Sequence, residues 1–244
     1  MVSNIEMPDD HDTERTEPAR RSIRSFVIRA GRATAAQERA LRALWPTYGV
    51  EWTGEPLDLD RIFGRRAPRM AEIGFGAGEA LLAFAQSHPE FDCIGVEVHP
   101  PGVGRLMIEA QRAGATNIRI INHDAVEALE RGFPPASLEL MHIFFPDPWP
   151  KKRHHKRRLI QPSFVELIAR VLKPGALLRL ATDWEPYALH MRETIDASPH
   201  FDNLAGADGF VARSTERPLT RFERRGQRLG HGVWDLCYRR TEAP

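Results

Sequence analysis

The stretch EIGFGAGE, residues 72–79, gives the first indication of the fold of this 244-residue chain. It lies between the apolar run 70–73 and a helical pattern over 79–86, in which Leu81, Leu82 and Phe84 share one side. Glycine is needed in such a strand–helix turn because the backbone turns sharply and must approach a ligand closely. The GxGxG spacing is a weak signal by itself, and a simple tight turn stays open as the alternative.

Acidic residues beside this turn narrow the choice of ligand. A dinucleotide places its phosphates at the N-terminus of the following helix, where negative charge is favoured. Here Glu79 begins that helix and Glu72 precedes the turn, so both carboxylates would repel a pyrophosphate. S-adenosylmethionine has no phosphate and carries a sulfonium and an ammonium group. The turn, with Gly74, Gly76 and Gly78 against the cofactor, therefore favours S-adenosylmethionine over NAD.

Strand and helix patterns alternate after this turn. We expect further strands at 91–98, 118–121, 138–145 and 176–181, helices at 102–113, 161–172 and 186–197, and late strands near Phe210 and Val233. The segment Lys173-Pro174-Gly175 is expected to end the helix over 161–172. Such alternation predicts an α/β fold with a parallel sheet covered on both faces.

The N-terminal part of the chain has a different character. Residues 1–22 are rich in charge and poor in apolar groups, which predicts a disordered tail. Residues 35–48 predict a short helix that stops at Pro46. The expected organisation is a tail over 1–22, a helical extension over 23–68 and an α/β domain over 69–240.

Two more acids follow the second and third predicted strands. Glu97 ends the strand 91–98, where a carboxylate can accept hydrogen bonds from both ribose hydroxyls of a nucleoside. Asp124 comes just after 118–121 and is placed to accept from the exocyclic amine of adenine. Either acid could instead face solvent, and Asp124 could cap a short helix over 125–130. Their position at successive strand ends favours a cofactor site.

The fourth strand ends in FFPDPWP, residues 144–150. Two prolines fix the backbone around Asp147, and Trp149 follows two residues on. Ligands of open parallel sheets bind at the carboxyl ends of the strands. We therefore expect Asp147 to point into a reaction site.

A basic run follows directly. It comprises Lys151, Lys152, Arg153, His154, His155, Lys156, Arg157 and Arg158. A run of charge is usually a solvated face, but this one lies beside a strand end that carries a candidate catalytic acid, in a chain whose formal net charge is only +1. The run therefore favours a site for RNA phosphates.

Two further segments are expected to converge on the same place. Strand 176–181 is followed by Asp183 and Trp184, again an acid and an aromatic residue at a strand end. In residues 217–226, Phe222 could stack on a base while Glu223 accepts from N–H donors, a combination suited to guanine. By itself the segment 217–226 could equally be an amphipathic surface element.

Composition excludes several classes of protein. Apolar residues make up 42% and charged residues 27%, as in an ordinary globular protein. Cys93 and Cys237 lie in apolar runs without ligand spacing, so we expect reduced buried thiols and no metal site. No segment reaches the roughly 18 apolar residues of a membrane span, which predicts no membrane partner and a cytoplasmic protein. A monomer and a homodimer both stay open.

These segments together resemble the bacterial tRNA (guanine-N7-)-methyltransferases. The matching stretches are EIGFGAGE at 72–79, GVEVHPPGVG at 95–104, HDA at 123–125, FFPDPWPKKRHHKRR at 144–158, ATDWEPYA at 181–188, TRFERRG at 220–226 and GHGVWDL at 230–236. The resemblance runs from about residue 65 to residue 240, and its most specific part is Pro-Asp-Pro-Trp with the basic block.

The resemblance implies a Rossmann-like class I methyltransferase sheet of seven strands with the last one antiparallel. It implies S-adenosylmethionine as the cofactor and methylation of guanine N7 at position 46 in the tRNA variable loop. Glu72, Glu97, Asp124 and Asp147 take the positions of cofactor-contacting acids, and Asp147 that of the catalytic residue. Lys151, Asp183, Thr220, Arg221, Phe222 and Glu223 fall where the family binds the target nucleotide, and residues 153–158 on its RNA-contacting stretch.

Three other functions compete with this hypothesis. An NAD-dependent oxidoreductase is disfavoured by the glycine spacing and by Glu79. A non-catalytic RNA-binding protein on the same scaffold would leave Glu97, Asp124 and Asp147 without purpose. A methyltransferase acting on protein or on a small molecule is disfavoured by the basic run.

Overall fold

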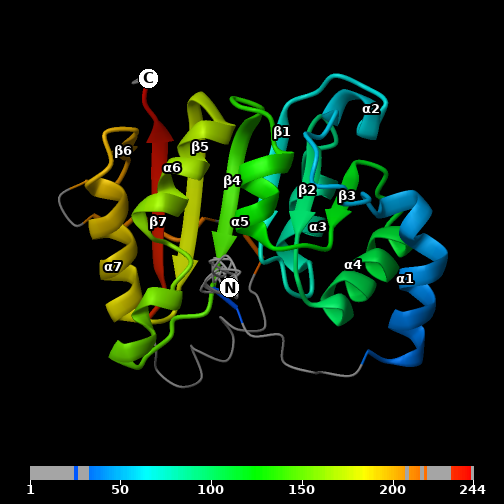
Figure 1. The fold of residues 1–244 in the computed structure, drawn as a ribbon, viewed down its shortest axis with the longest axis horizontal. Helices are drawn as coiled ribbons and strands as arrows, with labels where there is room; N and C mark the ends of the chain where they lie inside the picture. Colours follow the sequence, from blue (N-terminus) through cyan, green and yellow to red (C-terminus); the bar gives the residue numbers. More distant parts are fainter. Residues whose placement is uncertain (1–24, 27–32, 207–208, 215–216, 219–231, 243–244) are drawn as a thin grey trace, which may run out of the picture.

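The computed structural model describes residues 25–26, 33–206, 209–214, 217–218 and 232–242. Within them, seven strands form one sheet in the order β3-β2-β1-β4-β5-β7-β6 (Figure 1). The pairs among β1 to β5 are parallel, whereas β7 runs antiparallel to both β5 and β6. The expected α/β fold with a mostly parallel seven-stranded sheet and an antiparallel last strand is confirmed.

The strands are short and the helices alternate with them. The strands are β1 Arg69–Ile73, β2 Asp92–Val96, β3 Ile118–Ile121, β4 Leu138–Phe144, β5 Leu172–Thr182, β6 Phe201–Asn203 and β7 Trp234–Arg240. The α-helices are α1 Ala35–Tyr48, α2 Leu59–Phe63, α3 Glu79–Ser87, α4 Pro100–Arg112, α5 Ala125–Glu127, α6 Pro162–Val171 and α7 Glu185–Asp196. A π-helical turn η1 covers Ala128–Gly132 and a 3₁₀-helix η2 covers Lys152–Arg157.

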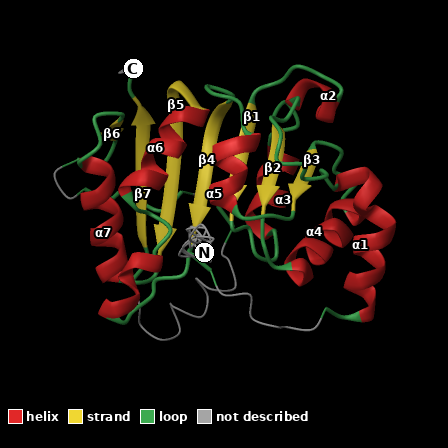
Figure 2. Cartoon of the chain, in the orientation of Figure 1, coloured by secondary structure: helices red, strands yellow, loops and turns green. Residues whose placement is uncertain are grey.

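Alternate strand residues divide the core between the two faces of the sheet. On one face Ala71 and Met141 pack with side chains of α6 and α7. On the other face Met70 and Leu140 pack with side chains of α1, α3 and α4. Successive strand residues point to opposite faces, so both faces of each central strand are apolar and covered by helices (Figure 2).

Three local predictions differ from the structure. The helix α1 continues through Pro46 to Tyr48, because a proline in the last turn leaves the bond from the Gly49 N–H to the Trp45 carbonyl intact. Strand β5 begins at Leu172 and contains Pro174 and Gly175, with a register shift opposite β4. A strand near Phe210 reduces to one bridge between Val211 and Asp235, and β6 was not predicted.

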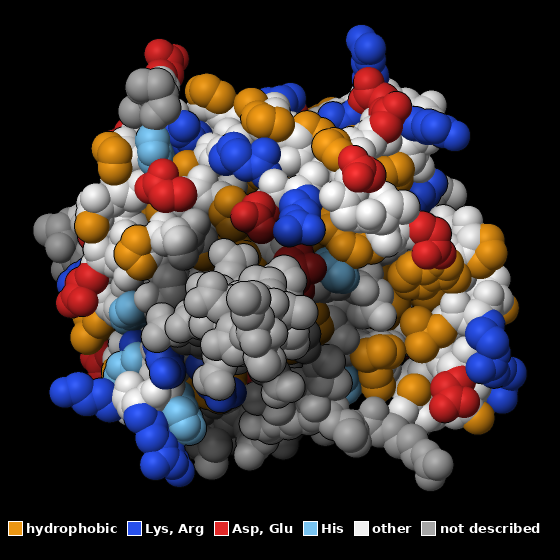
Figure 3. Space-filling model, viewed as in Figure 1, with side chains coloured by type: hydrophobic (Ala, Val, Ile, Leu, Met, Phe, Trp, Pro, Cys, Tyr) orange, Lys and Arg blue, Asp and Glu red, His pale blue; other side chains and the backbone are white. Residues whose placement is uncertain are grey.

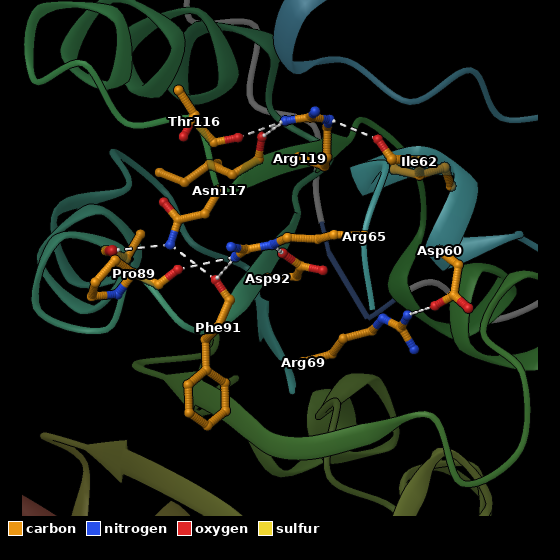
Figure 4. A network of polar contacts seen from close by, with 12 residues as sticks. Asp60, Ile62, Arg65, Arg69, Pro89, Phe91, Asp92, Thr116, Asn117 and Arg119 are labelled. Carbon is orange, nitrogen blue, oxygen red and sulfur yellow. Dashed lines mark hydrogen bonds and ion pairs between the residues drawn. The ribbon is translucent and has the colours of Figure 1, made fainter. Parts of the chain in front are cut away.

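Polar contacts tie the amino ends of β1, β2 and β3 together (Figure 4). The Arg65 guanidinium pairs with the buried Asp92 at 2.7 Å and donates to the carbonyls of Pro89 and Phe91. The Asn117 amide donates to the Ala85 carbonyl in α3 and to the carbonyls of His88 and Phe91 in the segment that joins α3 to β2. These side chains satisfy buried polar groups at that edge of the sheet, which gives them a structural role.

Candidate active site

A cavity of about 500 Å³ opens at the carboxyl ends of β1, β2 and β4. The residues that line it are Gln37, Glu72, Gly74, Phe75, Gly76, Ala77, Glu79, Ala80, His99, Pro101, Gly102, Arg105, Phe144 and Phe145. Its size and position suit a small organic ligand. The glycine turn predicted to bind the cofactor forms one wall, and Gln37 of α1 forms part of another, a contribution that the sequence did not reveal.

Three glycines give the turn its shape. Gly74, Gly76 and Gly78 have φ values of 68°, 57° and 78°, which side-chain-bearing residues rarely adopt. The turn also meets α4 at very short range, because a Cβ atom on Gly102 would lie 2.1 Å from the Gly76 carbonyl oxygen. Residues 74–77 of the turn therefore line the cavity, whereas Gly78 is not among its lining residues, and α4 packs closely against the turn at Gly76.

Glu97 organises this turn. Its Oε2 accepts from the Gly76 N–H at 2.8 Å, and its Oε1 accepts from the N–H groups of Val98 and His99 at 2.7 and 2.9 Å. A carboxylate offers about four acceptor sites, so one remains for a ligand. Recognition of a ribose by Glu97 stays a prediction.

Glu72 is the buried acid of the cavity. Its side chain is 3% exposed, and its Oε2 has no hydrogen-bond partner among the described residues. Burial, reinforced by the nearby Glu97 carboxylate, raises the pKa of Glu72 to about 8. An unpartnered carboxyl at the wall of a cavity is suited to a cationic group, because a cation would favour its ionised form. The ammonium group of S-adenosylmethionine meets that requirement.

Asp124 and Asp147 lie outside the wall of the cavity. Asp124 caps α5 by accepting from the Val126 N–H at 2.7 Å, the alternative that the sequence left open. Asp147 is exposed in the loop after β4, while Phe144 and Phe145 of the same segment line the cavity. Contact of either carboxylate with a cofactor or a base stays a prediction.

A buried ion pair lies under the loop after β4. The Arg217 guanidinium pairs with Asp235 at 3.1 Å and lies 5.4 and 5.2 Å from the ring centroids of Phe144 and Phe145. Asp235 is in β7, so the last strand supports two aromatic residues of the cavity wall. Sequence reasoning missed this pair because its members are 18 residues apart.

The basic run divides into exposed and buried cations. Lys151, Lys152, Arg153 and Lys156 are exposed, His154, His155 and Arg157 are half-buried, and Arg158 is 4% exposed. Lysine, arginine and histidine side chains gather at the lower left in Figure 3, where η2 lies. Partial desolvation and the cations around it lower the pKa of His154, so this imidazole adds no charge at neutral pH.

Arg158 does not occupy the position expected of a phosphate contact. Its Nε donates to the Pro148 carbonyl at 3.0 Å, and its guanidinium lies 4.9 Å from the centroid of the buried Tyr187 ring. This arginine reaches into the protein because its apolar surroundings and backbone acceptors lie there. The four exposed cations Lys151, Lys152, Arg153 and Lys156 face solvent.

Asp183 is half-buried after β5, beside the loop that follows β4. Thr220, Arg221, Phe222 and Glu223, like the tail 1–22, lie outside the described residues. Within the described ranges, no three His, Cys, Asp or Glu side chains are placed to hold a metal ion. In the same ranges, no helix has the length and apolarity of a membrane span.

Sequence relatives cover almost the whole chain. A family model described as "Putative methyltransferase" matches residues 66–236. A tRNA (guanine-N(7)-)-methyltransferase of Sodalis glossinidius is 51% identical over 99% of this chain and 100% of its own. The protein of that name from Alkalilimnicola ehrlichii is 55% identical over 92% of this chain and 95% of its own. One from Shewanella amazonensis is 52% identical over 91% and 93%.

Solved structures share the fold at low identity. The antibiotic-resistance methyltransferase Kmr superposes with a TM-score of 0.53 at 18% identity, over 80% of this chain and 96% of its own. A 16S rRNA (adenine(1408)-N(1))-methyltransferase of Catenulisporales acidiphilia, solved with cosubstrate SAM, gives 0.54 at 17% identity, over 77% and 94%. Because the [4+2]-cyclase SpnF is equally similar, with a TM-score of 0.52, these structures establish the class I fold alone.

The sequence relatives decide the family. At 51–55% identity over 91–99% of this chain, they match nearly all of its length. The chain therefore belongs to the bacterial tRNA (guanine-N(7)-)-methyltransferase family, whose methyl donor is S-adenosylmethionine.

Proposed function

We propose that this chain transfers the methyl group of S-adenosylmethionine to N7 of guanine at position 46, in the variable loop of tRNA. The observation that carries the proposal is the buried Glu72 carboxyl, whose Oε2 has no hydrogen-bond partner among the described residues, in a cavity also lined by Phe144 and Phe145, directly before the Pro-Asp-Pro-Trp loop and the basic run in the chain. The names of the relatives support guanine N7 and tRNA. A tRNA substrate also implies a cytoplasmic location.

Different residues at this site would bind different parts of the cofactor. Glu72 would face the ammonium group, and the backbone of Gly74 and Gly76 in the cavity wall, continued by Gly78, would lie against the methionine part. Glu97 would use its remaining acceptor site for a ribose hydroxyl, and Asp124 would accept from the adenine amine. Bound S-adenosylmethionine supplies an electrophilic methyl group on a positively charged sulfur.

Guanine N7 needs little chemical activation. It already carries a lone pair in the plane of the ring, so no proton must be removed before attack. The protein's main contribution is then alignment for in-line displacement, and stabilisation of the positive charge that the base gains. We assign Asp147 to orienting the guanine and offsetting that charge. Asp183 and Glu223 would accept from its N1–H and amino groups.

The exposed cations would hold the RNA. Lys151 adjoins the loop of Asp147 and would contact the target nucleotide, while Arg153 and Lys156 on η2 would contact phosphates. Arg157 lies over the Trp149 ring, 5.1 Å from its centroid, at the edge of the same surface. Arg221 would lie with Thr220 and Phe222 against the target nucleotide.

One experiment tests the reaction and its position together. The protein is incubated with S-adenosylmethionine and total tRNA, and 7-methylguanosine is mapped by chemically induced strand cleavage. Cleavage at guanine 46 that requires both protein and cofactor is expected. A transcript with adenine at position 46 is the matched control and should accept no methyl group. Cleavage elsewhere, or methylation of the control transcript, would contradict the proposed position.

A further inference from the structure

The loop after β4 has an unusual backbone. Phe145 and Trp149 adopt φ values of 52° and 45°, and they bracket Pro146-Asp147-Pro148 on both sides. Residues with side chains avoid this region, and such a conformation persists only where surrounding contacts determine it. The exposed Asp147 side chain makes no hydrogen bond or ion pair with the described residues that could fix the loop. The support must therefore come from its neighbours.

One end of the loop is fixed by the sheet and one by side chains. The Phe145 N–H donates to the Ala181 carbonyl at 2.8 Å, which continues the pairing of β4 with β5. At the other end, the Trp149 indole N–H donates to the Ser25 carbonyl at 3.0 Å. Between these points, the Pro148 carbonyl accepts from Arg158 Nε at 3.0 Å. Arg158 is thus the contact closest in the chain to Asp147.

Arg158 reaches a second loop with the same guanidinium. Its NH1 lies 3.5 Å from the Pro186 carbonyl, in the first turn of α7, and its plane lies over Tyr187. The Tyr187 hydroxyl accepts from the Ile160 N–H at 3.2 Å, which fixes the ring under the guanidinium. This turn follows Asp183 directly. One buried arginine therefore connects the loop of Asp147 with the loop of Asp183.

A third contact joins Arg158 to the basic helix. Its NH2 lies 3.2 Å from His155 Nε2 on η2. All the contacts need the flat, forked shape of a guanidinium, which the ammonium group of lysine does not have. Arg158 is 4% exposed, whereas Arg153 and Lys156 of the same run are exposed. Within these six residues, one positively charged side chain is therefore buried while others face solvent.

We propose that Arg158 is a positioning residue, which sets the loop of Asp147 against the loop of Asp183 and makes no contact with RNA phosphate. The inference rests on the proposed methyl transfer, because the two acids are assigned there to the guanine. The proposal gives Arg158 a different role from the exposed cations of the run, although all of them carry the same charge. Misplacement of a catalytic group lowers turnover more than it lowers substrate affinity.

Arg158→Lys tests the proposal because it keeps the charge and removes the fork. We expect kcat to fall roughly 100-fold, as for a catalytic group displaced by about 1 Å. The affinity for tRNA and the slope of its logarithm against the logarithm of salt concentration should match the wild type. The matched control, Arg153→Gln, should raise KM for tRNA and reduce the salt slope by roughly 0.7, with its larger effect on KM. An Arg158→Lys enzyme with wild-type kcat, or with a reduced salt slope, would overturn the proposal.

A second variant keeps the test decisive if lysine disturbs folding. Arg158→Ala leaves space for a free guanidinium ion, and millimolar methylguanidinium should restore kcat roughly tenfold without changing the salt slope. Cofactor affinity and the melting curve show that each variant is folded. If methylguanidinium restored tRNA binding of Arg158→Ala but not its kcat, the positioning role of Arg158 would be contradicted. Failure of the proposed function is distinguishable, because the wild-type enzyme would then give no 7-methylguanosine in the parallel reaction.

Discussion

The neighbouring strands β1 and β4 each end in a turn that contains residues with positive φ. The two turns use different types of residue at these positions. After β1, the residues with positive φ are Gly74, Gly76 and Gly78, whose backbones adopt it without strain. After β4, they are Phe145 and Trp149, for which it is costly. The first turn lies directly against the cavity. The second turn carries Asp147 away from the cavity wall and is held by side chains on several elements.

The residue types of each turn fit the role of that turn. A turn that meets a ligand through its backbone needs the absence of side chains, so glycine is sufficient, and Glu97 accepts from one N–H of the turn, that of Gly76. A turn that presents one carboxylate needs bulky neighbours to fix it, and these contact Arg217, Ser25 and Arg158. The turn after β1 depends on the space that the missing side chains leave, and the turn after β4 depends on contacts with residues far away in the chain.

Removal of the presented carboxylate gives the largest expected effect. Asp147→Ala should lower kcat on the order of 100-fold, because charge stabilisation at the reacting base is lost. Cofactor affinity should stay within about threefold, since Asp147 lies outside the cavity wall. Single-turnover rates and equilibrium titration measure the two quantities separately. Near-normal turnover would remove Asp147 from the catalytic role.

Filling the space behind the glycine turn should be the next largest effect. Alanine usually stabilises a helix relative to glycine, but a Cβ at Gly102 would lie 2.1 Å from the Gly76 carbonyl oxygen. Gly102→Ala should destabilise the protein by about 2 kcal/mol and lower Tm by about 6 °C, with weaker cofactor binding. Gly206→Ala is the control, since nothing lies within 4 Å of its Cβ position. Equal Tm values for the two variants would argue against the clash.

Cofactor binding should depend on pH through Glu72. With its pKa raised to about 8 by burial and by Glu97, this carboxyl is protonated in the free protein at neutral pH. It must release the proton to face an ammonium group, so affinity should rise up to about tenfold per pH unit between about pH 5.5 and 7.5. Titration calorimetry in two buffers of different ionisation enthalpy measures the release. A flat affinity profile in the wild type, or a sloping one in Glu72→Gln, would refute the assignment.

The smallest effect is expected at the exposed cations. Neutralising Arg153 and Lys156 together should weaken tRNA binding several-fold and flatten its salt dependence by about 0.7 per lost contact. Filter binding at several salt concentrations gives the slope. The double variant Arg39→Gln and Arg42→Gln on α1 removes the same charge far along the chain and should change the slope less. Equal slopes for the two double variants would mean that the run has no special role.

Much of this site could be predicted from local sequence. The glycine turn, the strand ends that carry Glu97 and Asp183, and the exposed cations at Arg153 and Lys156 follow from periodicity, spacing and charge, which are properties of neighbouring residues. The inward direction of Arg158 could not be predicted, because its acceptors at Pro148 and Pro186 come together only when β4 and β5 pair. The helix cap at Asp124 was one of two alternatives, and only the geometry showed that it forms.

The sequence was sufficient for the alternation of the central strands and helices and for the residues at the carboxyl edge of the sheet, because apolar periodicity and glycine or proline spacing act over a few residues. The family followed from the resemblance of whole motifs. Which charges are buried became visible only in the folded structure. Glu72 Oε2 has no hydrogen-bond partner in the described part of the chain, Arg217 pairs with Asp235, and Arg158 spans two loops, since burial and pairing depend on segments far apart in the chain. The residue type of a charged side chain does not show whether it lies in water or in the protein core. The free energy of its charged form depends on these surroundings.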